Sequence, residues 1–205
     1  MTVPYESTGR ANQKGRTRDA LVAATRELLA QGVIPTMEGA AAAAAISRTT
    51  AYRYFPNLRA LLVAAYPHAD EKSLLGSDPP PDPLARLQIV AESQTRRILE
   101  YEPEMRAVLR LSLEGDPTDG PGLPMHRGQR IAWIEDALAP LKGQMTANQL
   151  RLLVYGIGAT LGIEAFVWLT DIAGLSREDA AAIMCSNASQ LLRSAIAENG
   201  VPNSR

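Results

Sequence analysis

The stretch ISRTTAYRYFPN, residues 46–57, gathers two arginines, two tyrosines and three hydroxyl side chains within one short segment. Aromatic residues make up only 5% of the chain, so this concentration is unusual. Ser47 is a favourable N-cap residue, and Pro56 disfavours helical geometry at the residue before it. We therefore predict a short helix that opens at Ser47 and ends at about Phe55.

This predicted helix has two different faces. Ala51 and Phe55, with Ile46 before them, are placed to face inward and hold the helix on its support, whereas the cationic and hydroxyl side chains point outward. The preceding run TMEGAAAAAA, residues 36–45, predicts another helix, with Thr36 as its N-cap and alanine supplying helix propensity. Two short helices joined by a tight turn, the second rich in Arg, Thr and Tyr, are typical of a helix-turn-helix.

The outward side chains suit a double-stranded DNA partner. A recognition helix presents its N-terminal residues to base edges in the major groove. Arg48 can fork onto guanine O6 and N7, and Thr49 can contact a thymine methyl group or donate a hydrogen bond. Tyr52 and Tyr54 carry hydroxyl groups on rigid rings, which suit phosphate oxygens.

From Thr17 to about Leu62, the chain resembles the TetR family of bacterial transcriptional regulators. The run TMEGAAAAAAISRTTAYRYFPNLRALL, residues 36–62, is similar to that family's helix-turn-helix block, with SRTTAYRYF as the recognition helix. The resemblance implies a homodimer with an N-terminal DNA-binding domain and a larger C-terminal domain that binds a small inducer. It also implies a palindromic operator and DNA-facing positions at Thr36, Ser47, Arg48, Thr49, Tyr52 and Tyr54.

Four positions or segments depart from the family pattern. Tyr54 stands where many members have His, and Ala45 stands at the turn position that is commonly Gly, so a positive φ there implies strain. Leu58 replaces a frequent Lys, although Arg59 beside it can substitute. The second helix has exchanged nearly all its polar residues for alanine. These departures keep open a second interpretation, a helical ligand-binding or scaffold protein with weakened DNA binding.

Charge is distributed unevenly along the chain. Residues 1–66 contain eight Lys and Arg against four carboxylates, which gives +4, and the total of −1 leaves −5 for the remainder. We expect a basic flexible arm over residues 1–16, with Lys14 and Arg18 near DNA phosphates; a plain disordered terminus is the alternative. For Arg53 and Arg59, phosphate contact and simple solvent exposure both remain open.

The fold class is indicated by the segments rich in Gly and Pro that interrupt helices. Apolar residues recur at helical spacing between Gly- and Pro-rich connectors, and no alternating strand pattern of any length occurs. We predict an all-α protein of about nine helices, with Thr17 as the N-cap of the first. A helix-turn-helix domain is expected over residues 17–66 and a ligand-binding and dimerisation domain over 67–205. The last two helices are expected to be long, roughly 146–173 and 176–199.

Residues 152–170 are apolar on all sides, with Glu164 as their single charge. About 19 residues is close to the lower limit for a membrane span, but cationic flanks and a second span are missing. Gly156, Gly158 and Gly162 permit close approach of another helix. We therefore expect a central helix that also forms an oligomer interface, and a homodimer through the last two helices rather than a membrane partner.

The effector site is the least visible feature of the sequence. Aromatic and apolar side chains suit a small-molecule pocket, with a few charges for orientation, although core packing is the more common role of each of them. Glu164 needs a partner within its apolar helix. The candidate ligand-binding residues are Arg96, Tyr101, Met105, Leu109, Trp133, Glu164 and Trp168, with Arg110 and Phe166 as further possibilities; His126 is expected at the surface.

Other classes of protein fit less well. With two His, one Cys, no metal-ligand spacing, no Gly-rich phosphate loop and no Ser nucleophile motif, we expect no catalytic residue, metal or cofactor. A small helical enzyme using Glu164 or His126 is the weaker alternative. The N-terminus has no apolar signal region and Cys185 cannot form an internal disulfide, so a cytoplasmic location is expected.

Overall fold

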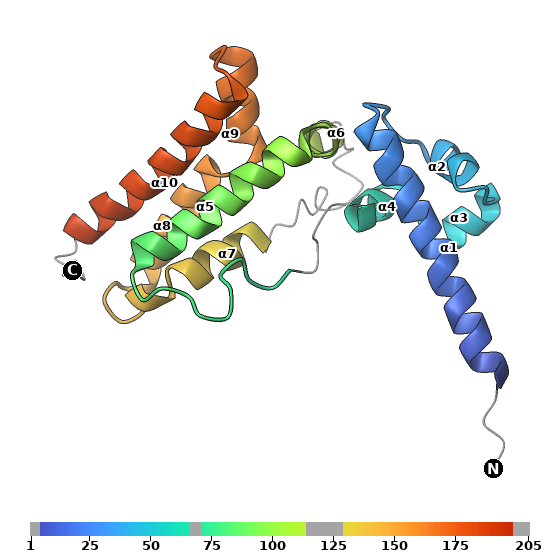
Figure 1. Cartoon of the computed structure of the whole chain (residues 1–205), viewed down its shortest axis with the longest axis horizontal. Helices are drawn as coiled ribbons and strands as arrows, with labels where there is room; N and C mark the ends of the chain where they lie inside the picture. The colour runs from blue at the N-terminus through green and yellow to red at the C-terminus, as the bar shows by residue number, and fades with distance from the viewer. Residues whose placement is uncertain (1–4, 66–70, 114–128, 199–205) are drawn as a thin grey trace. The chain divides into compact units, whose positions relative to one another are not determined.

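The computed structural model describes residues 5–65, 71–113 and 129–198 of the chain (Figure 1). Within these residues there are ten α-helices, one 3₁₀ turn and one π-helical turn, and no strand. The predicted all-α class is confirmed. The chain forms two compact units, Met1–Ala69 with Pro103–Met125, and Asp70–Glu102 with His126–Arg205. The grouping of α6, Glu102–Leu113, with the N-terminal helices was not indicated by the sequence.

The first unit begins with α1, Tyr5–Ala30, which is longer than predicted. The assignment of Thr17 as N-cap is wrong, because the helix already passes through that position. Nor is the described part of the 1–16 arm a flexible coil. No proline occurs between Tyr5 and Ala30, and Gly9 and Gly15 each weaken a helix by about 1 kcal/mol without ending it. The basic residues of this segment are therefore carried on a helix.

Three short helices follow: α2, Met37–Ala43, α3, Arg48–Tyr54, and α4, Leu58–Ala65. The predicted caps of α2 and α3 are confirmed, since Thr36 accepts from the backbone N–H of Gly39 and Ser47 accepts from that of Thr50. Each cap satisfies a helix N–H that has no partner within the helix. The helix-turn-helix segment is thus defined locally by its own hydroxyl residues.

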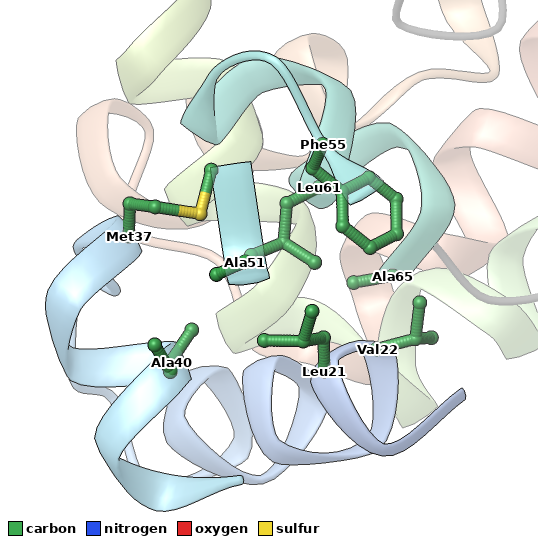
Figure 2. Packing of buried hydrophobic residues seen from close by; sticks show 9 residues of the cluster. Leu21, Val22, Met37, Ala40, Ala51, Phe55, Leu61 and Ala65 are labelled. Carbon is green, nitrogen blue, oxygen red and sulfur yellow. The ribbon is translucent and has the colours of Figure 1, made fainter. Parts of the chain in front are cut away.

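Alanine supplies four of the nine side chains in the buried core of this unit (Figure 2). Ala51 is fully buried and Phe55 is 4% exposed, while Ile46 packs against the cluster from its edge, which confirms the inward face predicted for α3. Because alanine has a small side chain, α2 can lie close to its neighbours. The buried cluster consists of Leu21, Val22, Met37, Ala40, Ala41, Ala51, Phe55, Leu61 and Ala65.

The turn between α2 and α3 contains a residue in the left-handed region. Ala45 has φ of 54°, and it is the one non-glycine residue with positive φ in the described part of the chain. The strain that the sequence predicted for a positive φ at this position is therefore present.

A side-chain hydrogen bond joins α1 to the end of α4. Arg26 of α1 donates from Nε to the carbonyl oxygen of Ala65 at 2.8 Å. That carbonyl belongs to the last turn of α4, where helix carbonyls have no helical partner.

The second unit is a helical bundle. Its helices are α5, Pro83–Glu100, α7, Gln129–Ala137, α8, Ala147–Thr160, α9, Ile163–Val167, and α10, Arg177–Glu198, with a 3₁₀ turn at Ala139–Leu141 and a π-helical turn at Trp168–Ile172. α10 packs along α5 and α8, and α7 packs against α8 and α5. Its largest fully buried side chains include Leu87, Ile134, Leu138, Ile157, Phe166, Met184 and Leu192.

The last helix agrees with its prediction, but the long helix predicted for 146–173 is wrong. It breaks at Leu161 and Gly162 into α8 and α9. At the break, Arg130 of α7 donates to the carbonyl oxygen of Gly158 at 2.9 Å, and its guanidinium also pairs with Glu164. The carbonyl near the end of α8 therefore has a charged partner from another helix.

No single described helix is long and apolar enough to cross a membrane. Only α8 together with the segment Ile163–Ile172 reaches the required length and apolar composition, and these two parts are bent by 43° relative to each other.

Candidate nucleic-acid interface and effector region

The outward face of α3 carries the cationic and phenolic side chains. Arg48, Thr49, Tyr52 and Arg53 are exposed, whereas Tyr54 is half-buried and packs against the core. The opposite face is fixed by the buried residues Ala51 and Phe55. This division leaves the N-terminal part of α3 open to a partner, as a recognition helix requires.

Arg48 is held by two neighbours. Its Nε lies 2.9 Å from Oε1 of Glu38 in the first turn of α2. The guanidinium also lies over the ring of Tyr52, at 5.6 Å from the ring centroid. Glu38 was not among the predicted site residues. The sequence shows only that an acidic residue stands two positions after the N-cap Thr36. Its contact with Arg48 depends on the packing of α2 against α3.

The remaining candidates for DNA contact lie around this face or on α1. Ser47 uses its hydroxyl as the cap of α3 and also donates to Thr50 at 2.9 Å. Arg53 stacks over the ring of Tyr54, and Arg18 of α1 lies 5.4 Å from the ring centroid of Phe55. The fold therefore brings Arg18 beside the C-terminal end of α3.

Lys14 is exposed on α1, Thr36 is exposed at the N-cap of α2, and Arg59 is half-buried in α4.

The described part of the first unit contains more basic than acidic side chains. Residues 14–65 carry seven Lys and Arg against three Asp and Glu. Of these seven, only Arg59 is not exposed. An excess of exposed positive charge attracts the phosphate backbone of nucleic acids, in a manner that weakens with salt.

The predicted effector residues have separate surroundings. Trp133 is buried and donates from Nε1 to the carbonyl oxygen of Glu71 at 2.9 Å, while Arg97 lies over its ring and pairs with the Glu71 carboxylate. Glu164 is about half exposed and pairs with Arg130. Trp168 is 55% exposed. Trp133 and Glu164 therefore have different partners and do not share one site.

The other effector candidates belong to α5 and α6 or to the core. Arg96 is exposed and donates to Ser93, and Tyr101 is half-buried at the end of α5. Met105 is buried and Leu109 half-buried in α6, where Arg110 is exposed. Phe166 is fully buried, and His126 lies outside the described residues.

Glu104, which sequence reasoning missed, is buried in α6. Its Oε2 has no hydrogen-bond partner among the described residues. A buried carboxylate oxygen without a donor is costly, so Glu104 is a candidate to bind a hydrogen-bond donor of a ligand.

One open hollow of about 240 Å³ lies in the second unit. Its lining is mostly apolar, with Thr160 and Asn187 as the polar groups, and it is smaller than the roughly 300–1,000 Å³ of typical ligand pockets. Among the predicted effector residues only Trp168 lines it. The full lining is Ala159, Thr160, Ala165, Trp168, Leu169, Met184 and Asn187.

Exposed apolar side chains also lie on the helices that line this hollow. Leu152 and Tyr155 lie on the same side of α8 as Ala159, because the three are spaced by three, four and seven residues. Leu191 lies one turn after Asn187 on α10, and the π-helical turn adds Trp168 and Ile172. We call this set the α8–α10 face: Leu152, Tyr155, Trp168, Ile172 and Leu191, which are 38–72% exposed.

Cys185 of α10 is the single cysteine of the chain and is partly buried against α5. Burial raises the pKa of its thiol above the ordinary value of 9.0; the contact with Thr95, at 3.6 Å, opposes this rise, and the negative charge of Glu92 adds to it. The thiol is therefore protonated at neutral pH and a poor nucleophile. In the part of the chain that the structure describes, no three His, Cys, Asp or Glu side chains are grouped to hold a metal ion.

A comparison with protein-family models gives no match for this chain, and a search among curated proteins finds no relative.

Proposed function

We propose that this protein is a transcriptional regulator of the TetR type, a homodimeric repressor that binds a palindromic operator and is released by a small molecule. The observation that carries the proposal is the two-sided helix α3. Its buried face anchors it through Ala51 and Phe55, and its open face presents Arg48, Thr49 and Tyr52. A short surface helix with exposed arginine and tyrosine side chains suits phosphate oxygens and base edges.

The surrounding structure supports the same function. α2 is packed against α3 across a tight turn, as in a helix-turn-helix. Arg18 and Lys14 extend the positive charge along α1. In such an interface Arg48 reads a base, while Lys14, Arg18, Thr36, Ser47, Tyr54 and the remaining arginines of α3 and α4 contact or attract the phosphate backbone.

The α8–α10 face supports the homodimer. Monomeric proteins rarely expose a contiguous large apolar surface, and a two-fold dimer covers the same surface on both copies. The face includes Trp168 and Ile172, at 55% and 72% exposure. A dimer also gives two recognition helices, which read half-sites separated by one helical turn, about 34–36 Å.

The release step needs a coupling between effector and DNA. A ligand that prefers one arrangement of the second unit alters the spacing of the two α3 helices and weakens both half-site contacts together. α4 is the proposed lever, because it follows α3 directly and Arg26 ties its last carbonyl to α1. Glu104, with its unpartnered oxygen, joins Arg96, Tyr101, Met105, Leu109, Trp133 and Trp168 as a residue to test for effector binding.

The decisive experiment is selection of DNA from a random double-stranded pool by the full-length protein. We expect a palindromic sequence to be enriched. Arg48→Ala is then expected to cost about 1–3 kcal/mol at one base pair of each half-site and to relax preference there. Lys14→Ala is expected to weaken all sequences alike and to lower the salt dependence by about one phosphate contact. Failure to enrich any sequence at low salt contradicts the proposal.

A second candidate is a helical ligand-binding or scaffold protein with weakened DNA binding. Two observations favour it: the positive φ of Ala45 in the turn and the alanine-rich sequence of α2. The same selection separates the two functions. If the protein forms the proposed dimer through the α8–α10 face but enriches no DNA sequence, the second candidate is supported.

A further inference from the structure

Glu38 and Arg48 form an ion pair between α2 and α3, at the surface proposed to meet DNA. The contact joins Oε1 of Glu38 to Nε of Arg48 at 2.9 Å, and both side chains are well exposed. An exposed pair of this kind contributes little to stability, about 0.2–1 kcal/mol. Its effect is therefore to be sought in what it does to Arg48.

The closest approach within this ion pair is made by Nε of Arg48. Arginine has five N–H donors, one on Nε and four on the two terminal nitrogens. Within the described residues, the terminal nitrogens of Arg48 make no hydrogen bond. One side of the guanidinium lies over the ring of Tyr52. Glu38 and Tyr52 thus restrain the guanidinium at its Nε edge and over one face, and its two terminal nitrogens have N–H donors that no hydrogen bond of the described residues uses.

These open nitrogens match one base. Guanine presents two acceptors, O6 and N7, at its major-groove edge, and a bidentate arginine contact uses two N–H donors against them. A restrained guanidinium loses less rotamer freedom when it makes that contact. It also keeps Glu38 as a partner, so a guanine in the correct position does not require the ion pair to break.

On other sequences, Glu38 acts against binding. Without a guanine in position, Arg48 can contribute only through a phosphate, and Glu38 offsets its positive charge locally. The Glu38 carboxylate itself is repelled by phosphates. The presence of Glu38 therefore lowers affinity for non-specific DNA more than affinity for the matching sequence.

We propose that Glu38 is a specificity-determining residue, which positions Arg48 for a guanine in each half-site and suppresses its binding to arbitrary phosphates. This inference rests on the proposed function. Glu38 makes no base contact in it and acts through Arg48.

The test uses full-length protein and two duplexes: one enriched by the wild-type protein from a random pool, and one with the same bases scrambled. Glu38→Gln removes the charge and keeps the side-chain shape. We expect its affinity for the scrambled duplex to rise about two- to tenfold, and the slope of log affinity against log salt to steepen there by about 0.9, the value for one added phosphate contact. The ratio of specific to scrambled affinity should fall by a similar factor.

Two controls separate this effect from a general change of charge. Glu27→Gln removes the same charge from an exposed residue of α1 that accepts from Gln31, away from the Arg48 contact, and should leave the ratio unchanged. In an Arg48→Ala background, Glu38→Gln should no longer lower the ratio, because its effect passes through Arg48. Melting temperatures of all variants confirm that they are folded.

The outcomes distinguish the two proposals. If the wild-type protein enriches no sequence, the proposed function fails and this inference fails with it. If the wild-type protein enriches a sequence but Glu38→Gln keeps the wild-type ratio of specific to scrambled affinity, only the inference is overturned. The same holds if Glu38→Gln lowers this ratio equally in the wild-type and Arg48→Ala backgrounds. A guanine preference that weakens in both Glu38→Gln and Arg48→Ala supports it.

Discussion

Arg130 and Glu164 face each other across the position where a side chain at residue 162 would begin. Nη2 of Arg130 lies 3.2 Å from Oε1 of Glu164, and Nη1 donates to the carbonyl oxygen of Gly158. A Cβ added at Gly162 would come within 1.8 Å of the Glu164 carboxylate and 2.2 Å of the Arg130 guanidinium. Any side chain at this position must therefore displace the ends of these two flexible side chains, whereas the backbone φ of −106° is itself open to any residue.

The first prediction is that Gly162→Ala displaces this ion pair. Because the Arg130 hydrogen bond to Gly158 is lost with it, we expect the free energy of unfolding to fall by about 1–2 kcal/mol, measured by urea denaturation. Gly158→Ala is the matched control, since its Cβ would lie at an ordinary 3.6 Å from Ile134. In an Arg130→Met background, Gly162→Ala should lower the free energy of unfolding by less. An unchanged loss would contradict the assignment of this effect to the displacement of Arg130.

The second prediction concerns the turn before α3. Ala45 adopts φ of 54°, which costs an L-residue with a Cβ about 1 kcal/mol or more, whereas glycine adopts it freely. Ala45→Gly should therefore raise the melting temperature. Ala44→Gly changes the neighbouring residue, whose φ of −82° is right-handed, and should lower it. Equal effects of the two substitutions would mean that Ala45 carries no strain.

The third prediction addresses the α8–α10 face. Ile172→Asp places a charge on its most exposed member and should convert the proposed dimer into monomers, because a buried charge without a partner opposes association. Sedimentation velocity at several protein concentrations measures this. Leu99→Asp, at an exposed position of α5 outside this face, is the control and should leave the sedimentation coefficient unchanged. A wild-type protein that is monomeric at high concentration contradicts the dimer.

The fourth prediction is a pH dependence at Cys185. Its folded pKa is raised by burial, so the unfolded chain releases this proton at a lower pH than the folded protein does. The stability contributed by this difference is present below the ordinary pKa of 9.0 and is lost as pH rises through the folded value. Cys185→Ala should remove that part of the stability loss. Alkylation of Cys185 by iodoacetamide should also be slower than that of free cysteine at pH 8.

Local signals in the sequence were sufficient for the helix-turn-helix. Thr36 and Ser47 cap their helices as predicted, and Ala45 has the positive φ that its position suggested. The errors have physical causes of a different kind. Without a proline, the basic segment before Thr17 continues as helix. The break at Gly162 is associated with Arg130, whose contacts with Gly158 and Glu164 come from about thirty residues away.

The site residues show the same limit. Except for Tyr54, which packs against the core, the outward and inward side chains of α3 could be assigned from spacing alone. Glu38 could not, because its contact with Arg48 depends on how α2 packs on α3. For the effector region, composition identified suitable side chains but not their uses. The indole N–H of Trp133 is taken by the backbone of Glu71, a pairing that no local pattern encodes.

The bend between α8 and α9 has a consequence for any helix that lies along this surface. Two straight helices can slide past each other by one turn, about 5.4 Å, and still find similar neighbours. A surface bent by 43° has no such repeat, because its two arms point in different directions. Only one alignment places both arms in contact at once. The break at Gly162 therefore fixes the one alignment in which the proposed dimer partner can contact both α8 and α9.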